Sequence, residues 1–153
     1  KIYCPELKVT LIDSLGKRLR FLQQVIEELG VKGIRCEHLR AEDAGRDKKH
    51  REKYDYVTAL AVARLSVLSE YCLPLAKKGG QFIALKGSKF AEEITEGEAA
   101  VKILGGKILS AEPVKLPGLA DGRAIIKIAK IKSTPAQYPR KAGTPEKQPL
   151  GAK

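Results

Sequence analysis

Length, composition and charge limit the classes of protein to which the chain can belong. It has 153 residues, of which 43% are hydrophobic, and this is enough for one domain with a buried core. Its 29 Lys and Arg against 18 Asp and Glu give a formal charge of +11, so we expect a phosphate-rich partner, either nucleic acid or a nucleotide. No apolar run approaches the roughly 18 residues of a membrane-spanning helix, which excludes that class and favours a cytoplasmic protein.

The first residue and the cysteines add further expectations. The sequence contains no Met and begins with Lys1, so we expect it to start inside a longer protein. Cys4, Cys36 and Cys72 are widely spaced and form no Cys-x-x-Cys pair, which indicates neither a disulfide framework nor a zinc site. We therefore expect three small buried thiols and no bound metal. We also expect the chain to be monomeric.

The chain opens with a strand pattern followed by a helix pattern. Residues 8–12 form a short β-branched run that predicts a strand, and this strand stops at Asp13. Ser14 is a candidate N-cap for the helix that apolar residues at helical spacing predict over 15–29. Gly30 supplies the stop at the end of that helix.

The alternation of strands and helices continues along the chain. Strands are predicted over 34–39, 54–60 and 81–85, the first of them as an edge strand. The polar segment 45–53 predicts a solvated loop or a short exposed helix. A helix that breaks near Pro74 is predicted from four apolar residues along one face: Leu65, Leu68, Cys72 and Leu75.

The last third predicts a helix, a hairpin and an arm. The helix covers 90–104, and two strand-like segments at 107–115 and 123–132 surround turn residues, which predicts an antiparallel hairpin. Strands that alternate with helices and end in a hairpin favour an α/β doubly wound sheet. The segment 133–153 holds four of the eight prolines and should be an extended basic arm, separate from a domain that covers 1–132.

In open α/β sheets the ligand lies at the carboxyl ends of the strands, so residues just past each strand are the candidates for a site. The carboxylate of Asp13 can accept both hydroxyls of a ribose, or it can cap the helix that follows. Glu42 is placed to contact an adenine, or it is a solvated surface acid. Lys86, followed by Gly87, closes an apolar strand and needs an anion or a carbonyl-rich ligand unless its side chain extends to solvent.

Six segments carry a family resemblance, and they occur in this order: VTLIDSLGKR (9–18), RAED (40–43), AVARL (61–65), PL to GG (74–80), ALKG (84–87) and YPRKAGTP (138–145). Together they resemble the ribosomal RNA small subunit methyltransferase G family, also called the glucose-inhibited division protein B family. The last segment is the most specific of them. The resemblance implies a Rossmann-like class I fold and a bacterial enzyme that uses S-adenosylmethionine to methylate a guanine N7 in 16S ribosomal RNA of the small ribosomal subunit.

The resemblance also implies roles for individual residues. Lys86 matches the lysine of the family's Leu-Lys-Gly motif near the site of methyl transfer, which makes it the catalytic candidate. The positions that the resemblance assigns to the cofactor are Asp13, Ser14, Ala41, Glu42 and Leu60. The positions that we expect to contact RNA are Arg64, Arg123, Tyr138, Arg140 and Lys141; Arg64 and Arg123 are alternatively surface arginines, and the arm is alternatively a disordered solvated tail.

Two departures from the family pattern bear on activity. Leu60 stands where the family carries an arginine near cofactor and substrate. The glycine-rich cofactor loop and the first strand, which belongs between the strands that end at Asp13 and near Leu60, are expected to precede Lys1. Without that strand, the two neighbours should either leave a gap or be forced together. A non-catalytic RNA-binding fragment and a nicotinamide-type dinucleotide-binding domain therefore stay as alternatives.

Overall fold

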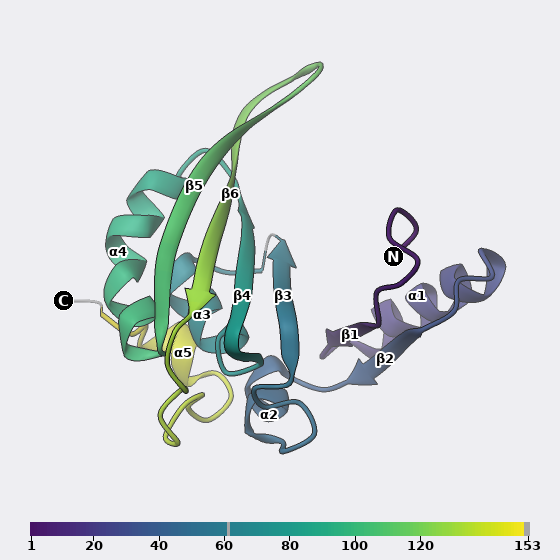
Figure 1. Ribbon diagram of the computed structural model, residues 1–153, viewed down its shortest axis with the longest axis horizontal. Coiled ribbons are helices and arrows are strands. Elements are labelled where there is room, and N and C mark those ends of the chain that lie inside the picture. The colour runs from purple at the N-terminus through teal and green to yellow at the C-terminus, as the bar shows by residue number, and fades with distance from the viewer. Residues whose placement is uncertain (61, 152–153) are drawn as a thin grey trace. The chain divides into compact units, whose positions relative to one another are not determined.

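The strands of the described residues, 1–60 and 62–151, form two sheets in this computed structural model (Figure 1). A two-stranded sheet belongs to the compact unit Lys1–Ala41, and a four-stranded sheet belongs to the unit Glu42–Lys153.

The first unit is a single βαβ crossover. Strand β1 (Val9–Asp13) runs parallel to β2 (Ile34–His38), and helix α1 (Gly16–Glu28) connects them. The three elements confirm the predicted alternation, including the stop at Gly30, whose φ is +61°. Every residue of β1 stays partly exposed, and Leu19 is the buried residue of α1. One helix on a two-stranded sheet buries little apolar surface.

The predicted N-cap of this helix is wrong. Helix α1 begins at Gly16, its N-cap position is Leu15, and that residue offers no side-chain hydrogen bond. The Oδ1 atom of Asp13 instead accepts the backbone N–H of Leu15 at 2.8 Å. The aspartate thus orders the turn between strand and helix, which is a common use of this residue type.

The second unit is built on a mixed sheet with the order β3-β4-β6-β5. Strands β3 (Tyr54–Leu60) and β4 (Ala76–Lys86) are parallel, whereas β5 (Gly106–Leu116) and β6 (Leu119–Lys130) form the predicted antiparallel hairpin. The hairpin strands are longer than predicted and continue to a tight turn at residues 117–118. In Figure 1 this hairpin projects well past the other strands of its sheet.

Helices α3 (Leu65–Cys72) and α4 (Phe90–Ile103) pack against each other and supply the core of this unit. Phe82 faces Ile128 across the β4–β6 ladder, and both side chains are fully buried. Each such side chain contributes about 2 kcal/mol of hydrophobic stabilisation. All eight residues of α3 are buried, so this helix lies at the centre of the unit.

Only one of the three cysteines behaves as predicted. Cys72 is buried in α3, and burial raises the pKa of its thiol to about 12. Cys36 is half-buried and Cys4 is exposed, which contradicts the expectation of three buried thiols. The reason is the thin first unit, whose single helix covers too little of the chain around these two positions.

The segments predicted to be solvated or extended are more ordered than expected. Helix α2 (Ala41–Arg46) and the turns after it contain the buried Ala44, Gly45 and His50, so segment 45–53 is not simply a solvated loop. The arm contains one helical turn, α5 (Thr144–Lys147), which corrects the prediction of an extended chain there. Pro145 fits the first turn of α5 because its missing N–H would have no helical partner. No helix among the described residues has the length and apolar character of a membrane span.

Gly105 ends helix α4 in a conformation that other residues adopt at a cost. Its φ is +84°, and a Cβ at this position would lie 2.3 Å from the carbonyl oxygen of Lys132. Gly79 has nearly the same φ, +85°, with nothing within 4 Å of its Cβ position. The two glycines therefore separate backbone strain from steric overlap.

We predict that Gly79→Ala lowers the free energy of unfolding by about 1 kcal/mol, the cost of a left-handed backbone at a non-glycine residue. Gly105→Ala should lower it by roughly 1–3 kcal/mol more, because the carbonyl must move as well. Urea denaturation of both variants measures the difference. Equal losses in the two variants would show that the carbonyl oxygen of Lys132 does not obstruct a Cβ at position 105.

Candidate functional site

Lys86 lies where strands β3 and β4 end side by side, with Leu60 opposite Leu85 in the ladder. Its Nζ atom is 2.6 Å from Oε2 of Glu93, and it donates to the carbonyl oxygen of Ala63 at 2.7 Å. The side chain of Lys86 is 8% exposed and that of Glu93 is 16% exposed. The ammonium group is therefore fixed between the loop after β3 and the first turn of α4.

Glu93 is the residue of this site that the sequence analysis missed. The same Oε2 atom also accepts the backbone N–H of Leu65 at 2.8 Å, at the start of α3. One carboxylate thus joins the end of β4, the start of α3 and helix α4. Glu92 and Glu93 both stand in the first turn of a helix, where acidic residues are common because they complement the helix dipole. That general preference hid the specific pairing.

The structure refines the prediction for Lys86. A buried ammonium group was expected to need an anion, and Glu93 supplies one from within the fold. The alternative in which the side chain extends to solvent is wrong. Of the three N–H groups of an ammonium, two are used by Glu93 and Ala63, so one is left for an acceptor outside the fold. A Cβ on Gly87 would meet nothing within 4 Å, so the space beside Lys86 is open.

Asp13 and Ser14 form the turn after β1 in the first unit. Besides the contact with Leu15, the carboxylate of Asp13 has its Oδ2 atom 3.4 Å from Arg18, and its side chain is 24% exposed. The Nε2 atom of His38 lies 3.0 Å from the carbonyl oxygen of Ser14 and donates to it. His38 was not predicted; it pairs with Asp13 in the β1–β2 ladder and supports the same turn.

Ala41 and Glu42 begin helix α2, but the carboxylate of Glu42 does not face solvent. Glu42 is 6% exposed, and its Oε1 atom accepts the backbone N–H of Gly143 at 3.0 Å. This contradicts the alternative of a solvated surface acid. The side chain holds the arm, while Ala41 is half-buried at the start of the helix.

The other positions around Lys86 are more exposed. The side chain of Leu60 is 60% exposed at the end of β3. Arg64 precedes α3 and lies 3.2 Å from Glu96, with both side chains largely in solvent, so this pair contributes little to stability. Arg123 is exposed in β6, next to Ala124, which pairs with Lys86 in the β4–β6 ladder. Ala61 of the AVARL motif lies outside the described residues.

The arm is held on the second unit by an ion pair. Glu70 is fully buried in α3, and its two carboxylate oxygens accept from Nε and Nη2 of Arg140, the closest pair at 2.7 Å. The backbone N–H of Arg140 also donates to Glu70 at 2.7 Å. Hydrogen bonding to Glu70 raises the pKa of Arg140. The prediction of a disordered tail does not apply to this segment, and the guanidinium of Arg140 is used inside the fold, not left free for RNA.

Tyr138 and Lys141, the other predicted RNA contacts of the arm, are half-buried and exposed respectively. The arm packs beside the last residues of α3, because Arg140 binds Glu70. Lys130 of β6 links the start of the arm to the residue after α3, since it donates to Thr134 and to the carbonyl oxygen of Leu73. Leu73 precedes β4, and Lys86 lies at the other end of that strand. The structure therefore does not bring the arm and Lys86 together.

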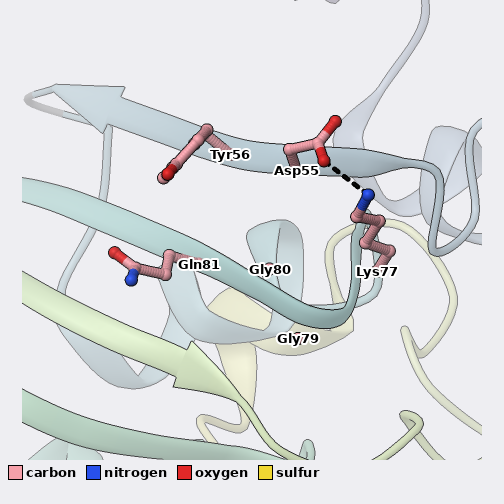
Figure 2. A pocket seen from close by; sticks show the side chains of 6 residues that line it. All are labelled: Asp55, Tyr56, Lys77, Gly79, Gly80 and Gln81. Carbon is pink, nitrogen blue, oxygen red and sulfur yellow. Dashed lines mark ion pairs between the residues drawn. The ribbon is translucent and has the colours of Figure 1, made fainter.

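A small hollow lies along the same two strands but away from Lys86 (Figure 2). It is lined by residues near the start of β3 and in the first half of β4, and its volume is about 100 Å³. An ion pair between Asp55 and Lys77 borders it. Ligand sites usually enclose about 300–1,000 Å³, so this hollow does not fit a nucleotide-sized cofactor. Among the described residues no cluster of His, Cys, Asp or Glu could hold a metal ion.

Comparisons with known proteins decide the family. The model of the GidB family, rRNA small subunit methyltransferase G, matches residues 1–119. The chain belongs to this family. It is 55% identical over 150 residues to the ribosomal RNA small subunit methyltransferase G of Lactobacillus acidophilus, which covers 98% of the chain and 62% of that relative. The chain thus spans less than two thirds of the length of the curated relatives it matches.

Solved structures show the same fold as this GidB chain. A 16S rRNA adenine-N1 methyltransferase from Catenulisporales acidiphilia aligns with a TM-score of 0.67 at 14% identity, over 88% of this chain and 78% of that chain. TYW2 of M. jannaschii in complex with AdoMet aligns with a TM-score of 0.57 at 15% identity, over 81% and 59%. At these identities the likeness concerns the fold, which confirms the predicted class I methyltransferase architecture.

We predict that Arg140→Met lowers the free energy of unfolding by roughly 3 kcal/mol, because it leaves the carboxylate of Glu70 buried without its cation. The double variant Arg140→Met/Glu70→Met should recover part of that loss, since it buries no charge. Urea denaturation of the two variants and of Glu70→Met completes the cycle. Additive losses would mean that the two side chains are not coupled.

Proposed function

We propose that this GidB protein transfers a methyl group from S-adenosylmethionine to a guanine N7 of 16S ribosomal RNA, with Lys86 at the site of transfer. Family membership supports the reaction class, and the fixed ammonium group of Lys86 carries the proposal for this chain. That group lies at the carboxyl ends of β3 and β4, where open α/β sheets bind their ligands.

The contacts of Asp13 and Glu42 indicate whether these two residues are free to bind S-adenosylmethionine. The carboxylate of Asp13 uses one lone pair for Leu15 and has a long contact with Arg18, so it can still accept the two hydroxyls of a ribose. Ser14 beside it is exposed, and His38 steadies the turn. The carboxylate of Glu42 does not fit a direct contact with an adenine, because it is buried against Gly143. When bound, S-adenosylmethionine supplies the methyl group.

The chemistry of the target base asks little of the protein beyond positioning. Guanine N7 carries an exposed lone pair on the major-groove edge, so no general base is required to remove a proton. Guanine O6 is an acceptor on the same edge, and the remaining N–H of Lys86 can donate to it. Fixing the base in this way would supply the near-attack geometry on which the rate depends. Arg64, Arg123, Tyr138 and Lys141 stay as predicted RNA contacts.

Lys86→Met should abolish methyl transfer. It should leave the affinity for S-adenosylmethionine within about threefold, because the contacts that hold Asp13 do not involve Lys86. Lys89→Met, an exposed lysine three residues further on, is the matched control and should keep transfer. Transfer is measured with radiolabelled S-adenosylmethionine and 16S ribosomal RNA, and affinity by calorimetry.

Calorimetry also separates the proposal from the two alternatives. Binding of NAD without S-adenosylmethionine would identify a dinucleotide-binding domain. RNA binding without S-adenosylmethionine affinity would identify a non-catalytic RNA-binding protein. Equal transfer by the Lys86→Met and Lys89→Met variants would remove Lys86 from the reaction.

Restoring an arginine at position 60 tests whether the departure from the family pattern there affects RNA binding. The side chain of Leu60 is exposed at the end of β3, one strand away from Lys86, so an arginine there meets no steric obstacle from a packed core. We predict that Leu60→Arg strengthens binding of 16S ribosomal RNA by at least about threefold at low salt, with Leu60→Gln as the uncharged control. Fluorescence anisotropy measures both affinities. Identical affinities would show that this position does not face the RNA.

A further inference from the structure

Acidic side chains around the arm are turned inward or paired. Glu70 binds Arg140, and Glu42 accepts from Gly143. Glu52 lies 3.2 Å from Nζ of Lys130 and accepts the backbone N–H of Thr134. Asp47 caps the backbone of Lys49, and Asp55 pairs with Lys77. These contacts occupy five carboxylates in this part of the second unit, whereas Asp43 and Glu146 stay exposed.

Lysines of the same region remain directed to solvent. Among the described residues, five exposed lysines from three separate segments have no ion-pair or hydrogen-bond partner for their side chains, and we call them the distal basic face: Lys48, Lys49, Lys53, Lys78 and Lys132. Segment 45–53 is already basic by composition, with five Lys and Arg against two Asp and Glu. What the composition does not show is that its arginines are used inside the fold, whereas its three lysines stay unpaired within the described part of the chain.

Hydrogen bonds bring the three segments together. The backbone N–H of Lys53 donates to the carbonyl oxygen of Leu75, which places the loop after α2 beside the start of β4, where Lys78 lies. Thr134, two residues after Lys132, donates to Glu52, next to Lys53. The loop after α2 and the arm run side by side in Figure 1 as well.

Arg51 fixes this arrangement. Its guanidinium donates to the carbonyl oxygens of Gly45, Thr134 and Tyr138 at 2.7–2.8 Å, and to that of Pro135 at 3.3 Å. One side chain thus clamps the loop and the arm to each other. A charged surface that is ordered before binding loses less conformational entropy when a partner docks.

We propose that the distal basic face binds the phosphate backbone of folded RNA at a place remote from the methylated base. This inference rests on the proposed function, in which ribosomal RNA is the substrate. The face lies at the start of β4 and Lys86 at its end, so at least about 15 Å separate them at 3.3 Å per strand residue. Contacts there add affinity and register without touching the reacting base, which is how phosphate contacts act generally.

A charge-matched pair of variants tests the face. Lys48→Gln/Lys53→Gln removes two of its charges, and Lys8→Gln/Lys32→Gln removes two exposed lysine charges from the first unit. The test pair should weaken binding of a 16S ribosomal RNA transcript at least about threefold. It should also reduce the slope of log K against log salt by about 1.5, the value for two lost phosphate contacts. The control pair should change neither quantity, and S-adenosylmethionine affinity should be unchanged in both.

Each other result overturns the proposal. Equal losses in the two pairs would mean that the RNA senses only net charge. If the test pair binds more weakly than the control pair only to the assembled small subunit, and not to the RNA transcript, the face would belong to contact with a ribosomal protein. If the wild-type chain fails to bind the RNA at all, the proposed function fails together with this inference, whereas normal binding and an inert test pair refute the inference alone. Lys78→Gln/Lys132→Gln serves as a second test pair if the first unfolds.

Discussion

Backbone polar groups of a proline-rich segment must find partners outside regular secondary structure, and this constraint organises the second unit. The described part of the arm, residues 133–151, forms no strand and only one helical turn. Three arginines supply the missing partners: Arg51 donates to three carbonyl groups of the arm, Arg46 donates to that of Pro139, and Arg140 joins the arm to a fully buried carboxylate. Basic residues that looked like a charged tail therefore act as internal cross-links, and only the lysines remain for an external partner.

The same use of charge appears at the candidate site. Glu93 neutralises Lys86 and holds the start of α3, so the catalytic candidate is part of the framework that positions it. A lysine that is only exposed would need to be ordered by its substrate, whereas this one is fixed beforehand. Fixed donors aimed at a reacting base cost no reorganisation during the reaction. The structure thus supports a role for Lys86 in positioning the base more directly than the sequence pattern alone.

Local patterns predicted the elements well, because strand alternation, helical spacing and glycine stops act over a few residues. They also placed Asp13 and Lys86 at strand ends, where a ligand is expected. Sequence reasoning missed Glu93 only seven residues after Lys86, and it failed most where the deciding contact is distant in the chain: Arg140 and Glu70 are separated by 70 residues, and Gly143 and Glu42 by 101. No local pattern marks a carboxylate as the partner of a remote cation. The roles of Glu42 and Arg140 changed for this reason.

The formal charge of +11 consequently says less about binding than the positions of the acids do. A guanidinium that bonds to backbone carbonyls adds to the count but has few N–H donors left for a partner's phosphates, as Arg51 shows. The electrostatic potential outside a protein follows its summed charges, and an ion pair such as Glu52 with Lys130 or Glu70 with Arg140 has no net charge. The positive potential around the arm therefore comes mainly from the exposed lysines that remain unpaired.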